Sequence, residues 1–247
     1  MAKKMWAYAK YNGEYIYNYV GDKKKNRLFF IWEALRLRRA SEDSRYRRER
    51  KGTPEFDFKY LTFISTHKDP NHRKPLHPVK TGYYRYPQGE ASVNQGGDGE
   101  SISHQLTILA LSQLESIPFI INDSELTLEF TDFAIDGEDT KIMFEDGKSY
   151  FIDLIGYLSN TSPMFNEWGG KVGIEVKYTH GYEREEERIQ LLERHNIPIL
   201  EVAVTKSFVY PSERKGKLAS GGTSPDELES HFNMLVDRYG TRVIPPF

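Results

Sequence analysis

The feature that most constrains the fold is an apolar, β-favouring run that contains two charged residues, Gly173-Ile174-Glu175-Val176-Lys177-Tyr178-Thr179. Side chains alternate between the two faces of a strand, so Glu175 and Lys177 project from one face. Ile174 and Val176 project from the other face, toward a core. Removing a carboxylate and an ammonium from water costs free energy, which a metal ion or a phosphate-bearing substrate would offset. The run therefore predicts a sheet with a charged site on one face.

A second carboxylate precedes this run in a similar setting. Asp153 lies within the apolar residues 150–155, which predict another strand. Carboxylates and carbonyls are the ligands that Mg²⁺ prefers. A lysine beside them can orient a water molecule as an ammonium, or deprotonate it as a neutral amine where burial beside the metal lowers its pKa. We therefore expect Asp153, Glu175 and the carbonyl of Val176 to hold Mg²⁺, and Lys177 to act on the attacking water. The alternative is a structural ion pair between these carboxylates and Lys177.

The Glu-x-Lys spacing alone is weak evidence, because about 25% of the residues in an average protein are charged. Two other triplets of this kind begin at Glu49 and Glu213. The first lies in a basic run and the second in a loop-like segment rich in Pro, Ser and Gly. Only the triplet that begins at Glu175 falls in a strand pattern, so its context carries the prediction.

Composition excludes several kinds of chemistry. The 247 residues contain no Cys, which excludes disulfides, thiolate zinc sites and cysteine nucleophiles. An aromatic content of 13% suits a mixed α/β protein with several strands. No segment approaches the roughly 20 apolar residues that span a bilayer, and no signal-peptide core follows the first residues. We therefore expect a cytoplasmic protein with no membrane contact.

Charge is distributed unevenly along the chain. Residues 23–51 contain twelve Lys and Arg and four Asp and Glu, a net charge of +8, whereas the whole chain has a net charge of −2. The rest of the chain is therefore near −10. Such polarity allows a basic surface to contact nucleic acid while an acidic pocket holds metal. The alternative is a basic helix face that contacts only solvent.

Local patterns predict a first domain over residues 1–95, a β-rich module with a basic, DNA-contacting helix. Asn12-Gly13 between two alternating runs predicts a hairpin with a type I′ turn. The Gly-, Asn- and Gln-rich residues 88–99 predict a linker. The other elements expected here are a helix from Leu28 to about residue 39 and strands over 56–64 and 82–86.

The second domain is predicted over residues 96–247. Ser224-Pro225-Asp226-Glu227 has the pattern of a capping box and predicts the start of the last helix. Periodicity predicts a helix, a run of strands, a second helix and a last strand over residues 100–204, a pattern that contains the order α-β-β-β-α-β. The expected elements are helices over 101–114 and 182–195 and strands over 126–130, 141–144, 149–158, 171–178 and 197–204.

This order, with an Asp and a Glu-x-Lys on neighbouring strands, resembles the PD-(D/E)xK nucleases. The stretch from Glu100 to His104 and residues 174–180 resemble the competence-protein CoiA-like family, over roughly residues 99–204. The resemblance implies an α/β (α+β) fold: a restriction-endonuclease-like core of a mixed central sheet flanked by helices, behind a β-rich N-terminal module. It implies that Glu100 is a further metal-site or water-orienting carboxylate. His104 would contact phosphate or metal.

The chain departs from the CoiA-like pattern in two places. Ile108 stands where a Lys often follows the histidine by four residues, and the Cys-rich knuckle of the N-terminal module is absent. The alternative for His104 is a helix-capping or core histidine. For Glu100 it is a charge favoured by the helix dipole.

The expected function is Mg²⁺-dependent cleavage of DNA by an endonuclease, with Mn²⁺ able to substitute, in DNA processing or antiviral defence against foreign DNA. Many nucleases of this fold cut both strands as homodimers, so a homodimer and a regulatory protein partner both stay open. Three alternatives are left: a catalytically silent DNA-binding module of the same fold, an RNA-directed nuclease, and a protein-interaction module with a basic arm.

Overall fold

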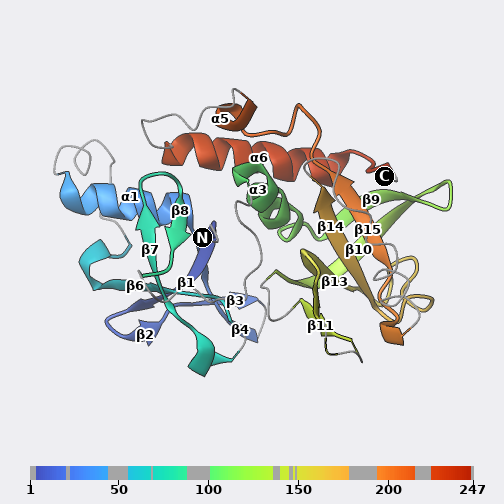
Figure 1. Ribbon diagram of the computed structural model, residues 1–247, viewed down its shortest axis with the longest axis horizontal. Helices are drawn as coiled ribbons and strands as arrows, with labels where there is room; N and C mark the ends of the chain where they lie inside the picture. Colours follow the sequence, from blue (N-terminus) through green and yellow to red (C-terminus); the bar gives the residue numbers. More distant parts are fainter. Residues whose placement is uncertain are drawn as a thin grey trace. The chain divides into compact units, whose positions relative to one another are not determined.

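The computed structural model is a mixed α/β protein with more strand than helix and several sheets, including a curled half-barrel (Figure 1). The chain divides into two compact units, residues 1–100 with 218–230 (unit 1) and residues 101–217 with 231–247 (unit 2). The predicted boundary between residues 95 and 96 lies outside the described residues. The structure describes residues 4–20, 23–43, 55–67, 69–87, 101–135, 140–144, 147, 149–177, 194–214 and 224–245.

Unit 1 is built on a six-stranded sheet around β1 (Trp6–Tyr11). β1 pairs antiparallel with β2 (Glu14–Tyr15) through a turn in which Asn12 and Gly13 have φ angles of 50° and 88°. Both φ angles are positive, as a type I′ turn requires, so the predicted hairpin turn is confirmed. The sheet order is β2-β1-β6-β7-β8, with β5 also paired to β1; the further strands are β5 (Leu28–Phe30), β6 (Leu61–Ile64), β7 (Pro75–Val79) and β8 (Tyr83–Arg85).

Two predictions in unit 1 were wrong at their boundaries. The helix expected from Leu28 begins at Ile31 and ends at Glu42 (α1), because Leu28–Phe30 pairs with β1 instead. The strand expected over 56–64 is a strand only in β6, because Phe58–Tyr60 forms a short 3-10 turn capped by the side chain of Asp57. The lysines at positions 23 to 25 lie in a separate two-stranded sheet of β3 (Tyr17–Val20) and β4 (Lys23–Asn26).

Unit 2 holds a five-stranded sheet in the order β15-β14-β13-β10-β9 (Figure 1). Pairing is antiparallel except between β14 and β15, which are parallel. A separate hairpin of β11 and β12 belongs to the same unit. The strands are β9 (Ser116–Ile121), β10 (Ser124–Ala134), β11 (Lys141–Met143), β12 (Ser149–Phe151), β13 (Leu154–Leu158), β14 (Lys171–Lys177) and β15 (Ile199–Ala203).

After residue 100 the structure describes α3 (Ile102–Leu111) and α5 (Pro211–Arg214) in unit 2, and α6 (Pro225–Thr241), which begins in unit 1 and ends in unit 2. α3 packs against β14. The predicted start of the last helix is confirmed at Pro225. The helix predicted over 182–195 lies outside the described residues except for its last two positions. No described helix is long and apolar enough to cross a membrane.

The predicted order of elements in unit 2 needs two corrections. β9 was not predicted, and it adds an edge strand to the sheet. The strand predicted over 149–158 is broken, because the chain bends at Asp153 between β12 and β13. Asp153 therefore stands just before a strand and not within one. The restriction-endonuclease-like core stays a prediction.

Candidate active site

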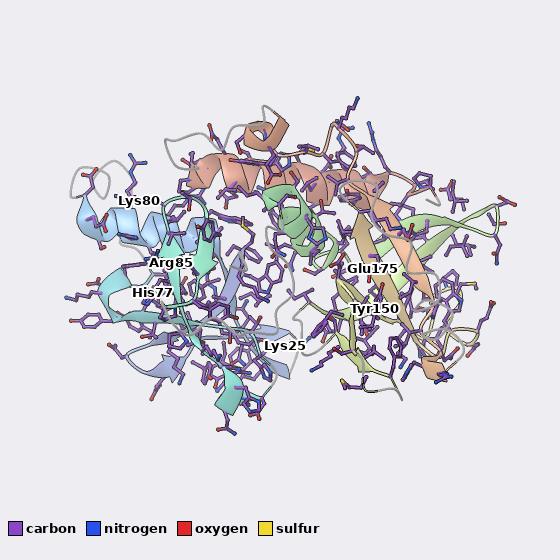
Figure 2. All side chains as sticks on the ribbon, viewed as in Figure 1. Lys25, His77, Lys80, Arg85, Tyr150 and Glu175 are labelled. Atoms are coloured by element: carbon purple, nitrogen blue, oxygen red, sulfur yellow. The ribbon has the colours of Figure 1, made fainter. Side chains whose placement is uncertain are left out.

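Two neighbouring strands of the unit 2 sheet carry carboxylates, and a third carboxylate lies just before the next strand. The parallel pairing of β14 and β15 sets Glu175 opposite Glu201. The antiparallel pairing of β13 and β14 sets Leu154 opposite Ile174, and one further step of this register brings Asp153 opposite Glu175. Residues that are opposite one another in a sheet point to the same face. Glu175 and Glu201 therefore share a face, and Asp153 occupies the position beside Glu175 on the other side. Figure 2 shows Glu175 on this sheet.

The other face of β14 is fully apolar. Val172, Ile174 and Val176 are at most 5% exposed, whereas Glu175 and Lys177 are half-buried. This burial pattern agrees with the alternation predicted from the sequence. It fixes the register of β14, because a slip of one residue would carry both charges into the core.

Asp153 completes the sheet edge where β13 begins. Its Oδ2 atom accepts a hydrogen bond of 2.8 Å from the backbone N–H of Val176. The same oxygen lies 3.2 Å from Nε2 of His104 on α3. The Asp153 side chain is 20% exposed, so it also reaches solvent. This carboxylate thus joins the helix to the sheet and stays accessible to a ligand.

The carbonyl of Val176 lies on the same side as Asp153. The carbonyl of Lys177 accepts a hydrogen bond from the N–H of Val204, which follows β15. The backbone groups of successive residues in β14 therefore point to opposite neighbouring strands, Lys177 toward β15 and Val176 toward β13. Within one strand residue the N–H and the C=O point the same way. Because the N–H of Val176 points to Asp153, its carbonyl faces that side as well.

Lys177 contacts Glu201 on the neighbouring strand. Its Nζ atom lies 2.5 Å from Oε1 of Glu201, and the two side chains are 19% and 9% exposed. The ion pair considered from the sequence joined Lys177 to Asp153 or Glu175. Sequence reasoning missed Glu201, although it is the single charged residue within the apolar residues 197–204 and could have been noticed for that reason.

The N-terminus of α3 is held by acceptors from the protein itself. The Ser101 side chain accepts from the N–H of His104 at 3.0 Å. The Glu213 carboxylate from α5 accepts from the N–H groups of Ile102 at 2.6 Å and Ser103 at 3.0 Å, and also from the Ser103 hydroxyl. The first turn therefore needs no external anion. The Glu213 triplet, interpreted from the sequence as a loop, contributes this cap.

The helix that carries His104 begins at Ile102, with Ser101 as its N-cap in extended conformation. Glu100 lies outside the described residues, so its predicted role beside His104 stays a prediction. The His104 ring is 14% exposed and contacts the Asp153 carboxylate. His104 therefore does more than cap the helix.

An apolar cluster borders the charged face. Ile155 is opposite Gly173, and Gly173 is opposite Ile199, which puts both isoleucines on the face of Glu175. The β11–β12 hairpin packs there through Phe144 and Tyr150. Apolar surroundings lower the local dielectric, so the charges of the site interact more strongly than they would in water.

The donor set suits a hard divalent cation. Among the described residues, no three His, Asp or Glu side chains converge closely enough to hold a metal ion by themselves. Mg²⁺ usually needs only one or two carboxylates, and it completes its shell with waters and substrate phosphates. Asp153, just before β13, and Glu175 on β14 fit that requirement by their chemistry. Asp153, Glu175 and Glu201 also outnumber Lys177 at this end of β14.

No family model matches the chain, and neither the curated proteins nor the solved structures contain a significant match. The interpretation of the site therefore rests on its own geometry.

Proposed function

We propose that the protein is a metal-dependent nuclease that hydrolyses DNA phosphodiester bonds, in DNA processing or in defence against foreign DNA. The observation that supports the proposal is that Asp153 accepts a hydrogen bond from the backbone of β14 at Val176, beside Glu175 and Lys177, which project from one face of that strand. Phosphodiester hydrolysis needs an activated water and a stabilised phosphate, and this set of side chains can serve both needs.

Each residue has a role that follows from its contacts. Asp153 and Glu175, with the carbonyl of Val176, would hold Mg²⁺, which supplies a polarised water and neutralises phosphate charge. Lys177 would orient that water as an ammonium, or take its proton as the neutral amine, and Glu201 fixes the position of the Lys177 nitrogen. His104, next to Asp153, would contact the phosphate. Glu100 is retained as a further carboxylate of this site.

Exposed cations of unit 1 support a nucleic-acid substrate. His77 and Arg85 are opposite one another on β7 and β8, and Lys80 lies in the turn between these strands (Figure 2). All three side chains are exposed. The Lys80 ammonium and the Arg85 guanidinium can contact phosphates without regard to base sequence.

A catalytically silent DNA-binding module is the second candidate. Two observations favour it: the described residues contain no closed metal-holding group, and Asp153 already has a structural partner in the N–H of Val176. Both candidates predict DNA binding, so cleavage is what separates them.

The test is cleavage of circular plasmid and linear duplex DNA by the purified protein with Mg²⁺, Mn²⁺ or EDTA. Asp153→Ala and Lys177→Ala are run beside the wild type, with Glu167→Gln as a control, because Glu167 is an exposed carboxylate of the same unit. Metal-dependent loss of the circular form that both variants abolish and the control retains supports an endonuclease. Intact DNA with unchanged binding in all proteins supports the silent module.

A further inference from the structure

The β3–β4 ribbon of unit 1 presents a face of tyrosines and cations. Its register sets Tyr17 opposite Asn26 and Tyr19 opposite Lys24, so these four side chains share one face. Tyr19 is 72% exposed and Tyr17 is 38% exposed, and Lys24 is exposed too. The Lys24 ammonium lies 3.8 Å from the centre of the Tyr17 ring. Large side chains at this exposure on a two-stranded ribbon bury little area within the fold.

The same chemistry continues along the chain toward the main sheet. The rings of Tyr15 and Tyr17 are 6.3 Å apart. Lys10 lies 4.6 Å and Arg73 5.2 Å from the centre of the Tyr15 ring. Tyrosines thus stand at positions 15, 17 and 19. Lys10 and Arg73 lie beside Tyr15, and Lys24 lies beside Tyr17. We call Tyr15, Tyr17 and Tyr19 with Lys10, Lys24 and Arg73 the tyrosine stripe.

We propose that the tyrosine stripe binds unpaired nucleotides, with bases stacked on the tyrosine rings and phosphates held by the cations. Single-stranded nucleic acid is recognised by aromatic side chains interleaved with positive charge, because every base has a π-face and every linkage a phosphate. The inference rests on the proposed function and deepens it: the substrate would carry an unpaired segment that unit 1 holds.

Charge and chemistry favour this occupant over an apolar protein partner. The stripe contains no aliphatic side chain, and its cations complement a polyanion. Asp and Glu do not occur among its six residues. Duplex DNA buries its bases inside the stack, so it can use the cations of the stripe but not the exposed ring of Tyr19.

The test is a binding measurement in EDTA, which keeps cleavage out of the result. Fluorescence anisotropy is measured with a labelled thymidine oligonucleotide of about 12 nucleotides, a length within the range that one binding module covers, and with a blunt duplex of the same length. The variants are Tyr19→Ala, Tyr19→Phe and Lys24→Ala. Tyr157→Ala is the matched control, since Tyr157 is a 42% exposed strand tyrosine of unit 2. Thermal unfolding of each variant checks that it is folded.

The proposal predicts that Tyr19→Ala weakens oligonucleotide binding by about 5- to 150-fold, the range that the loss of one stacked base implies. Tyr19→Phe and the control should stay within about twofold, because they keep the stripe's rings. Lys24→Ala should reduce the slope of log K against log salt by about 0.7. Duplex binding should respond to Lys24→Ala and not to Tyr19→Ala.

Wild-type affinity of a folded Tyr19→Ala protein for the oligonucleotide would overturn the proposal, as would equal losses for single strand and duplex. The result is independent of catalysis. Loss of oligonucleotide binding in Tyr19→Ala, without metal-dependent cleavage by the wild type, would support the binding role of the tyrosine stripe and refute the nuclease. Metal-dependent cleavage by the wild type, with normal binding by Tyr19→Ala, would support the nuclease and refute the binding role of the stripe.

Discussion

Lys177 on β14 lies with its ammonium 2.5 Å from the carboxylate of Glu201 on the parallel strand β15. Both side chains are mostly shielded from water, so the pair is more than a surface contact. Since Lys177 is the ammonium of the candidate active site, Glu201 is the residue that sets its position. The pair also explains how β14 carries a lysine on a half-buried face.

Replacing Glu201 tests this positioning role. Glu201→Gln keeps the size of the side chain and removes its charge, so Lys177 loses its fixed partner. We expect the cleavage rate to fall by about 10- to 100-fold, the usual effect of removing a supporting partner at a metal site. A shift in the pH profile of cleavage should accompany the fall, because the environment of the Lys177 ammonium changes. Unchanged rate and pH profile, with Glu167→Gln as the control, would refute the role of Glu201.

The cap on α3 predicts a stability effect. Glu213 accepts two backbone N–H groups and the Ser103 hydroxyl, and Ser103 is fully buried. Glu213→Ala leaves these donors without their acceptor, so the free energy of unfolding should fall by about 1–3 kcal/mol. Urea unfolding of this variant and of Glu167→Ala measures the effect. Equal stability of the two variants would show that the cap contributes nothing.

Close packing at Gly156 predicts a steric effect. A Cβ atom at this position would lie 2.5 Å from Cε1 and 2.7 Å from Cδ1 of the Phe130 ring. Gly156→Ala should therefore destabilise the protein by about 1–3 kcal/mol, the usual cost of overpacking. Combining it with Phe130→Leu should cost less than the sum of the two single changes, because the smaller side chain makes room. Additive effects in a double-mutant cycle would contradict the contact.

Burial of a phenol predicts sensitivity to alkali. Burial raises the pKa of Tyr84 well above its usual value near 10. The unfolded chain ionises this phenol above about pH 10 and the folded protein does not, so the stability that Tyr84 contributes is present below pH 10 and is lost as pH rises. As pH rises from 9 to 11, the stability of Tyr84→Phe should therefore fall less steeply than that of the wild type. Tyr157→Phe is the control for the loss of one tyrosine, and parallel pH curves for Tyr84→Phe and the wild type would contradict the prediction.

Local signals predicted the parts of the fold that local chemistry decides. The Asn12-Gly13 turn and the start of α6 at Pro225 both depend on residues that are adjacent in sequence. The alternation of β14 likewise fixed the faces of Glu175 and Lys177.

Elements that depend on distant partners were missed. Leu28–Phe30 continues a helical pattern but pairs with β1, and tertiary pairing overrides propensity. β9 was missed although its burial alternates; Pro118 weakens its strand pattern and is tolerated at this edge of the sheet.

The same limit applies to the candidate site. Its central triplet could be found because a charged pair in an apolar strand is unusual. Glu201 and Glu213 could not be assigned their roles, because each acts through a contact with an element far away in sequence. At the bend, Asp153 likewise makes a long-range contact, the hydrogen bond that the N–H of Val176 donates to its carboxylate.

The measurement that tests the central claim most directly is the rate of plasmid cleavage by Glu175→Gln in Mg²⁺. Glu175 lies between Asp153 and Glu201 in the candidate site, and the substitution by Gln removes its charge while keeping its size. The account predicts cutting by the wild type and by Glu167→Gln, a loss of more than about 100-fold in Glu175→Gln, and retained DNA binding by all three proteins. Equal cleavage by Glu175→Gln and the wild type would contradict the assignment of the site.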